Sequence, residues 1–325
     1  MKSVLVTGAT GFVGRMLCRS VTAAGGKVRG VARHVGEPER MRGIGEFIPC
    51  DLRGDFDAER LLDGIDVVVH LAARVHVMRE DCPDPLAEFR SVNRRATVQL
   101  AESAARLGVR RFVYASTIKV NGESTNARPF AETDVASPQD AYAISKWEAE
   151  QELGRIATET GLEVVIVRPP LVYGPGVGGN FLRLMKLADA GLPLPLDRID
   201  NRRSLVSVWN LCDFLMCCMS HPSAGGETFL ISDGEDFSTS QLYRQIAKGL
   251  GRPSRLLPLP SSLIKFAQRS RRLRPIIERL TGSLQVDSSK AAVLLGWSPP
   301  VSAEEGVILT TQAYRDVAGW RTNGD

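Results

Sequence analysis

The sequence lacks the features that would place a protein in a membrane or outside the cell. No apolar run approaches the ~20 residues that a membrane-spanning helix requires, so we expect no stable membrane insertion. The N-terminus has no basic segment followed by an apolar one, so we expect no secretory signal peptide. These absences predict a cytoplasmic protein.

Cysteine is present but is not arranged for metal binding or for disulfides. The six cysteines are scattered along the chain and include no CxxC pair. This spacing favours buried thiols in a reducing compartment. We therefore expect neither a bound metal nor a disulfide framework.

Charge of one sign is not in large excess either. The formal net charge is +4, which does not require nucleic acid as a partner and suits a phosphate-rich ligand. The basic cluster at residues 269–274 is predicted to be a solvated helix end, with an amphipathic face on anionic lipid as the alternative. The chain of 325 residues is 43% hydrophobic, which is enough for a large core and two lobes.

Short apolar runs alternate with helical segments along the first half of the chain. Such alternation predicts an α/β fold with a Rossmann-type doubly wound parallel sheet. In such sheets ligands lie across the carboxyl ends of the strands. Strands are predicted at 3–7, 27–32, 46–49, 66–71, 110–115 and 162–167, and helices at 12–24, 56–63, 86–107 and 139–160.

The most informative motif is Thr-Gly-Ala-Thr-Gly-Phe-Val-Gly at residues 7–14, which follows the first strand. Glycines at 8, 11 and 14 permit a tight turn, a close approach of backbone to a pyrophosphate, and close packing of the next helix. That helix directs its free N–H groups and positive dipole end at the phosphate. The motif, between strand and helix, predicts a dinucleotide site.

The second half of the chain has a looser pattern. From Pro169 onward, paired prolines and glycines mark long loops. We expect residues 1–168 to form the nucleotide-binding domain and residues 169–325 to form mostly a smaller, partly interleaved substrate-binding lobe. A helix at 208–219 and a strand at 227–231 are predicted to return residues 205–232 to the first domain.

Three residues in the first half form a candidate catalytic set. Tyr142 and Lys146 are four residues apart on a predicted helix and therefore share one face. A neighbouring ammonium stabilises a phenolate and lowers the pKa of the tyrosine. Thr117, at the end of the predicted strand 110–115, can hydrogen-bond the substrate oxygen that Tyr142 protonates.

Together and in this order, these motifs resemble the extended short-chain dehydrogenase/reductase family. The branch they resemble is the epimerase/dehydratase group that acts on nucleotide sugars, and the resemblance covers essentially the whole chain. It implies a nucleotide-diphosphate sugar as substrate and a homodimer paired through helices 86–107 and 139–160. It also implies that Thr117, Tyr142 and Lys146 are catalytic.

The resemblance further implies the binding residues. Family motifs match the glycine loop, Asp51-Leu52, His70-Leu-Ala-Ala73 and Arg168-Pro-Pro-Leu-Val-Tyr-Gly-Pro-Gly176. Residues implied to bind cofactor are Gly8, Thr10, Gly11, Phe12, Val13, Gly14, Arg33, Asp51, Leu52, Leu71, Ala72, Ala73, Asn93, Ala115, Tyr142, Lys146 and Pro169. Residues implied to bind substrate are Ser116, Thr117, Lys119, Asn180, Arg203 and, as the loosest match, Arg279.

One departure from the family pattern bears on the reaction. Relatives that remove water carry Thr-Asp-Glu after the fifth strand, where the two carboxyl groups serve as acid and base. This chain has Thr117-Ile118-Lys119 instead. Dehydration therefore lacks its acid and its base, which leaves oxidation or reduction at C4 of the sugar.

The position after the second strand bears on the cofactor. An acid roughly 20 residues past the glycines typically meets the ribose of NAD, whereas this chain has Arg33. An arginine there suits a 2′-phosphate and favours NADP(H). NAD(H) remains possible if Arg33 stacks on adenine instead.

The preferred interpretation of the sequence is therefore a reductase. The residues Ser116–Gly122 resemble the corresponding sequence in a bacterial branch that includes UDP-N-acetylquinovosamine-type 4-ketoreductases of O-antigen synthesis. We expect reduction of a UDP-2-acetamido-2,6-dideoxy-4-keto-hexose with NADPH. The alternative is a UDP-glucose or UDP-N-acetylglucosamine 4-epimerase, and a third possibility is a nucleotide-binding protein without turnover.

Overall fold

A seven-stranded parallel sheet forms the centre of the molecule. The computed structural model describes residues 2–34, 41–75, 84–258, 270 and 274–322. The strand order β10-β6-β5-β4-β1-β2-β3 confirms the predicted doubly wound α/β fold. The strands are β1 Ser3–Thr7, β2 Lys27–Ala32, β3 Glu46–Pro49, β4 Val67–His70, β5 Arg111–Ala115, β6 Glu163–Arg168 and β10 Thr228–Leu230.

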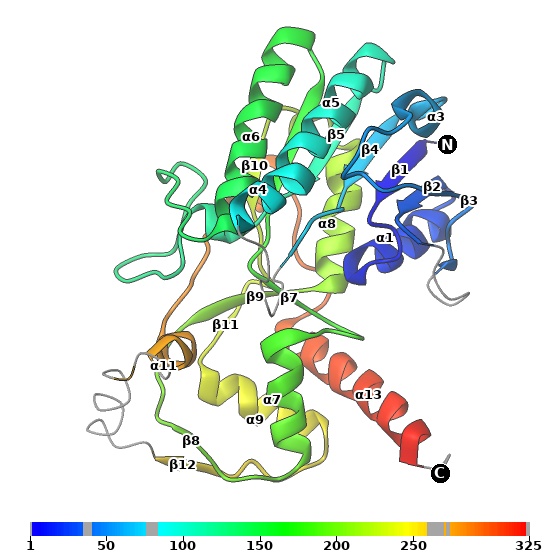
Figure 1. Ribbon diagram of the computed structural model, residues 1–325. Coiled ribbons are helices and arrows are strands. Elements are labelled where there is room, and N and C mark those ends of the chain that lie inside the picture. Colours follow the sequence, from blue (N-terminus) through cyan, green and yellow to red (C-terminus); the bar gives the residue numbers. More distant parts are fainter. Residues whose placement is uncertain (1, 35–40, 76–83, 259–269, 271–273, 323–325) are drawn as a thin grey trace.

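Helices cover both faces of this sheet (Figure 1). One face packs against α3 Ala58–Leu62, α5 Ala96–Arg106 and α6 Ala141–Thr160 through a cluster that includes Leu61, Leu100 and Leu153. The other face packs against α1 Phe12–Ala23, α8 Val208–Ser220 and α12 Ser289–Leu295. With both faces buried, the strands consist of nearly continuous apolar runs, which is why they are recognisable in the sequence.

The helix predicted at 86–107 is not one continuous α-helix. It consists of α4 Pro85–Arg90, a π-helical turn at Ser91–Arg95, and α5. A π-turn inserts one residue into the helical repeat and is frequently found at functional sites. Here the inserted turn contains the fully buried Asn93, whose side-chain hydrogen bonds stabilise the irregular backbone.

The second half of the chain forms smaller sheets and a separate helical layer. Figure 1 shows this layer beyond the carboxyl ends of the central strands. Its core joins α7 Gly179–Asp189, α9 Thr239–Gly249 and α13 Ala303–Thr322 through a cluster that includes Phe181, Tyr243 and Val307. The remaining elements are β7 Leu171–Tyr173, β8 Leu194–Asp197, β9 Arg203–Ser207, β11 Asp236–Phe237, β12 Leu256–Pro258, α11 Arg274–Thr281 and the short turns Ile118–Val120 and Pro222–Ala224.

The chain returns to the first sheet after entering the second half. Strand β10 pairs in parallel with β6, and α8 packs against α1 and the central strands. The division into residues 1–168 and 169–325 stays a prediction. Within the described ranges, no helix is long and apolar enough to cross a bilayer. Of the basic cluster, only Ser270 and Arg274 lie within those ranges.

Candidate functional site

The glycine loop makes contacts that leave no room for larger side chains. Gly8 has a φ of +66°, and a Cβ atom there would lie 3.0 Å from the backbone nitrogen of Ala72. A Cβ atom at Gly14 would lie only 2.2 Å from the carbonyl oxygen of Gly8. Gly11 closes the turn by donating its N–H to that same carbonyl at 2.9 Å. The loop therefore forms the tight crossing from β1 to α1 that only glycine permits.

The N-terminus of α1 is open to an anion. Its cap residue is Gly11, which has no side chain to satisfy the first N–H groups, and the first turn carries no acidic residue. Free N–H groups at a helix N-terminus attract phosphate. Thr10, Phe12 and Val13 lie at this end. The loop and the helix end together fit the pyrophosphate of a dinucleotide.

A buried chain of hydrogen bonds fixes the backbone beside this loop. Nδ1 of His70 lies 2.8 Å from the Thr7 hydroxyl, and Nε2 lies 3.0 Å from the Thr97 hydroxyl. The Thr97 hydroxyl donates to a backbone carbonyl, so it must accept from Nε2, which leaves Nδ1 to accept from Thr7. Burial lowers the pKa of His70 to about 3, so the ring stays neutral.

The same chain positions two predicted cofactor residues. The Thr7 hydroxyl accepts the N–H groups of Leu71 and Ala72, both at 3.1 Å. The carbonyl to which Thr97 donates belongs to Asn93. The Asn93 side chain accepts from the Arg74 N–H at 2.8 Å and donates to Ser145 at 2.9 Å, which links the loop after β4 to α6.

The region predicted to meet the adenosine carries opposed charges. Arg33 is exposed just after β2. Asp51 is exposed after β3 and pairs with Arg53 at 2.5 Å. Hydrogen bonds from Arg53 lower the pKa of Asp51 to about 2, with a smaller contribution from the charge of Arg33. Leu52 is buried beneath them.

Thr117 and Tyr142 meet where β5 ends and α6 begins. Asp140 caps α6 by accepting the N–H of Ala143 at 2.7 Å, which places Tyr142 in the first turn. Burial and the charge of Asp140 raise the pKa of Tyr142 to about 12, while a hydrogen bond with Thr117 opposes the rise. The two hydroxyl groups therefore present one combined donor and acceptor site to a substrate oxygen.

Lys146 lies one helical turn beyond Tyr142 and is almost fully buried, with 1% of its surface exposed. Its ammonium lies 3.9 Å from the centre of the Tyr114 ring. Burial lowers the pKa of Lys146 to about 7, and the negative charge of Glu150 opposes this change. No carboxylate among the described residues lies within ion-pair distance of Lys146, so its charge is available to a neighbouring phenolate or ribose.

A buried ion pair supports the helix that carries Tyr142 and Lys146. Glu150 and Arg168 pair at 2.5 Å, and Arg168 also donates to Asn121 at 2.9 Å. The Ser116 hydroxyl donates to Glu150. Ser116, which was predicted to bind substrate, therefore donates its hydroxyl proton to a residue of the protein itself. Sequence reasoning missed Glu150, although Tyr142, Lys146 and Glu150 follow a four-residue spacing that places them on one helix face.

The other predicted substrate residues lie in the second half of the chain. Arg203 is half-buried on β9 and donates to the Gly282 carbonyl at 3.0 Å, while Asn180 is exposed in the first turn of α7. Burial lowers the pKa of Arg203, and the charge of Glu123 opposes this shift. Arg279 lies on α11, but its side chain is outside the described part of the structure. Ala115 ends β5 and Pro169 follows β6, beside Thr117.

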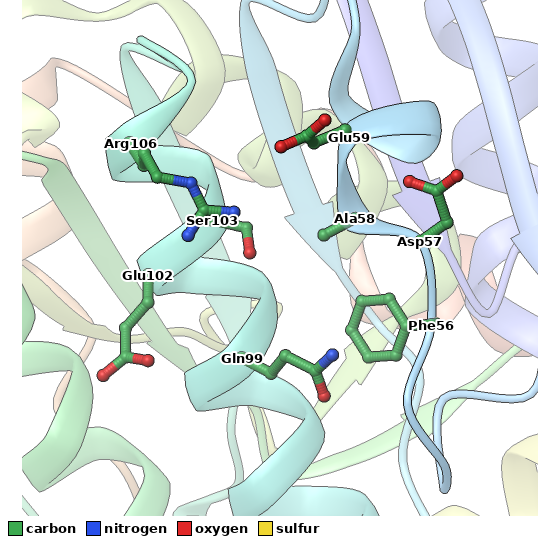
Figure 2. Close-up of a pocket in the computed structure, with 8 residues that line it drawn as sticks. All are labelled: Phe56, Asp57, Ala58, Glu59, Gln99, Glu102, Ser103 and Arg106. Atoms are coloured by element: carbon green, nitrogen blue, oxygen red, sulfur yellow. The ribbon is translucent and has the colours of Figure 1, made fainter.

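A separate hollow lies between α3 and α5, away from these residues. Figure 2 shows the side chains of α5 facing those around the start of α3. The hollow has a volume of about 400 Å³ and is mostly polar. It contains none of the predicted site residues and adds no chemistry to the site. Its lining residues are Phe56, Asp57, Ala58, Glu59, Gln99, Glu102, Ser103 and Arg106.

Comparisons with known proteins found a family model and relatives that match most of the chain. A model of the "NAD dependent epimerase/dehydratase family" matches residues 4–232. The chain is 44% identical over 317 residues to a UDP-glucose 4-epimerase of Vibrio cholerae, covering 96% of this chain and 95% of that protein. It is 30% identical to a UDP-glucose 4-epimerase of Mycolicibacterium smegmatis, covering 96% and 98%.

A solved structure shares the fold. The crystal structure of UDP-glucuronic acid 4-epimerase from Bacillus cereus, in complex with UDP-glucuronic acid and NAD, superposes with a TM-score of 0.78. The match covers 97% of this chain and 99% of that one, at 24% identity. This likeness supports the architecture described above.

Proposed function

Because this chain belongs to the NAD-dependent epimerase/dehydratase family, we propose that it is a UDP-hexose 4-epimerase. The observation that carries the proposal is the contact between Thr117 and Tyr142, with the buried Lys146 one turn away. Position 118 is a buried isoleucine, and Lys119 is a cation, so the acid and base of a dehydratase are missing. The 44% identity to a UDP-glucose 4-epimerase supports this reaction over the reductase that we expected from the sequence.

The cofactor that fits this proposal is NAD. The glycine loop and the open end of α1 would hold its pyrophosphate, and Leu71 and Ala72 would lie beside it. When bound, NAD would take the hydride from C4 of the sugar and return it to either face. NADP(H), favoured by Arg33, stays the alternative, because Arg33 is exposed and has no acidic residue next to it in sequence.

The protein's own residues would manage the proton at the C4 oxygen. Tyr142 would accept this proton during oxidation and return it during reduction. Thr117 would hydrogen-bond the same oxygen and hold it against the phenol. Lys146 would stabilise the phenolate, since a neighbouring ammonium favours the charged form.

The second half of the chain would hold the nucleotide diphosphate. Strand β9 and helix α7, which carry Arg203 and Asn180, lie beyond the carboxyl ends of the central strands (Figure 1), where ligands bind in doubly wound sheets. Their residue types suit phosphate and ribose oxygens. We also propose a cytoplasmic homodimer, as the family resemblance implies.

The proposal is tested by incubating the purified protein with UDP-glucose and no added cofactor. Appearance of UDP-galactose, resolved by chromatography, is the expected result. The reductase alternative predicts instead that NADPH is consumed with a UDP-linked 4-keto-6-deoxy sugar and that UDP-glucose stays unchanged. That second outcome would overturn the epimerase proposal.

A further inference from the structure

Lys119 occupies the position where the family's dehydratases carry the glutamate of Thr-Asp-Glu. In this chain the side chain at that position is a cation that contacts two carboxylates. Its ammonium pairs with Asp140 at 2.7 Å and with Glu123 at 2.9 Å. Burial alone would lower the pKa of Lys119, but hydrogen bonds with these two carboxylates raise it above its ordinary value. Lys119 is therefore a permanent cation in a half-buried position.

The two carboxylates connect Lys119 to the catalytic helix and to the predicted diphosphate site. Asp140 caps α6, two residues before Tyr142, and its charge disfavours the phenolate. Glu123 interacts electrostatically with Arg203. Lys119 thus lies between the residue that performs proton transfer and the arginine expected to hold the substrate.

Several elements in the described part of the chain bring side chains near Tyr142. From α6 come Asp140 and Lys146, and from the strand and turn before it come Tyr114 and Thr117. From α4 comes the uncharged ring of Phe89, 6.2 Å from the Tyr142 ring, with Arg74 stacked on Phe89 at 5.5 Å. Among these groups the charge of Asp140 opposes the phenolate most directly.

We propose that Lys119 is a positioning residue for Tyr142, acting through the ion pair that it makes with Asp140. The cation offsets part of the effect of the Asp140 carboxylate, whose charge disfavours the phenolate, and it holds the capped first turn of α6 against the loop after β5. This inference rests on the proposed role of Tyr142 as the acid–base group. It differs from the sequence-based prediction, in which Lys119 binds the substrate directly.

The test is the pH profile of kcat/KM in the NAD-loaded protein. Lys119→Met removes the ammonium that pairs with Asp140, so the acidic limb should move to higher pH by about 0.5–1 unit. Lys119→Arg keeps the charge and should restore the wild-type limb. Lys248→Met is a matched control, since Lys248 pairs with Glu304 at 2.7 Å on the distant helix α9 and should move nothing.

A double-mutant cycle identifies the route of the effect. Asp140→Asn keeps a good helix cap but removes the charge, so the limb should move to lower pH. Lys119→Met in the Asp140→Asn background should then have less than half its effect in the wild type, because coupled residues are not additive. An undiminished effect would overturn the route through Asp140.

A second measurement does not depend on turnover. The ultraviolet absorbance of the phenolate, with Tyr142→Phe as the blank, reports the ionisation of Tyr142 in each NAD-loaded variant. A higher midpoint in Lys119→Met supports the proposal even if no epimerisation is detected, which would contradict only the proposed function. If Lys119→Met raises KM but leaves both the acidic limb of the pH profile and the midpoint of Tyr142 ionisation unchanged, the positioning role is overturned. That result would favour direct substrate binding by Lys119.

Discussion

The buried Glu150–Arg168 pair shows how single side chains hold the segments that carry the candidate catalytic residues. Glu150 is 3% exposed and is paired with Arg168, which is 5% exposed. The pair also orients Ser116, which directly precedes Thr117, and Asn121, which lies further along the same loop. Removing one charge would leave the other buried without its counter-charge, which costs more than the pair contributes.

We predict that Glu150→Gln destabilises the protein by about 3–5 kcal/mol, because the Arg168 guanidinium loses its buried counter-charge. Denaturant unfolding measures this change. The matched control is Glu152→Gln on the same helix. Glu152 pairs with Arg94 at the surface and should cost less than about 1 kcal/mol. Equal losses for the two variants would contradict the buried-pair account.

Gly14 provides a prediction about the cofactor. We expect Gly14→Ala to abolish NAD binding, because the new Cβ atom would lie 2.2 Å from the Gly8 carbonyl oxygen and would displace the loop. Gly154→Ala is the control, since nothing lies within 4 Å of its Cβ position on α6. That variant should bind NAD normally and gain about 0.5–1 kcal/mol of stability. Fluorescence titration with NADH compares them.

At the scale of elements, a buried network joins β7, β9 and α8. The Tyr173 hydroxyl donates to Asp233 at 2.7 Å, and Asp233 accepts the Ser207 N–H at 2.8 Å. Asn210 on α8 donates to the same carboxylate at 2.6 Å. Burial raises the pKa of Asp233 because it disfavours the charged carboxylate. The hydrogen bonds from these donors oppose that rise and hold the carboxylate between β7, β9 and α8.

We predict that Tyr173→Phe destabilises the protein by about 1–3 kcal/mol, because a buried carboxylate oxygen loses its donor. Thermal unfolding measures the loss. Tyr243→Phe removes the hydroxyl of a side chain that is equally buried as a whole, but its hydrogen bond to Leu192 is long at 3.4 Å and only partly buried. If Tyr243→Phe loses as much stability as Tyr173→Phe, the hydrogen bond to Asp233 contributes no more than an ordinary tyrosine hydroxyl.

The elements also show what the sequence can and cannot predict. Each of the six strands predicted in the first half begins and ends within one residue of its prediction, because strands buried on both faces have continuous apolar sequences. The break in the helix at 86–107 was not predicted. It depends on Asn93 meeting Arg74 and Ser145, which are distant in sequence.

The candidate site likewise contains residues that local motifs predict and contacts that only the tertiary structure shows. The set Thr117, Tyr142 and Lys146 could be chosen from local motifs, since a strand end and one helix face bring them together. The pairing of Glu150 with Arg168 and of Lys119 with Asp140 required the tertiary structure. The family resemblance marked Lys119 as a substrate residue, whereas its two carboxylate partners favour the internal role proposed above.

At the scale of the whole molecule, the loop after β5 ties the two halves together. Thr125 donates its N–H to Ser283 at 2.9 Å, and Phe130 donates to Gln285 at 2.9 Å. Gly282, next to this segment, accepts from Arg203. The loop that follows Thr117 is therefore fixed to the segment beside the predicted diphosphate site.

The predicted homodimer belongs to this scale. Surface ion pairs join α6 to the helices beside it, with Arg90 and Glu148 at 2.5 Å and Arg155 and Glu102 at 3.2 Å. These pairs stiffen the helical face that the family resemblance assigns to dimerisation. Sedimentation equilibrium should give twice the chain mass of 35.4 kDa. A single chain mass at micromolar concentration would contradict the predicted homodimer.

Tyr142 is the residue that we propose to move the proton at C4 during epimerisation. The most direct measurement is the rate of interconversion of UDP-glucose and UDP-galactose by Tyr142→Phe, compared with Tyr243→Phe and with the wild type. We predict a loss of at least about 100-fold in Tyr142→Phe, with NAD still bound, and little change in Tyr243→Phe. Interconversion by Tyr142→Phe at the wild-type rate would contradict the account.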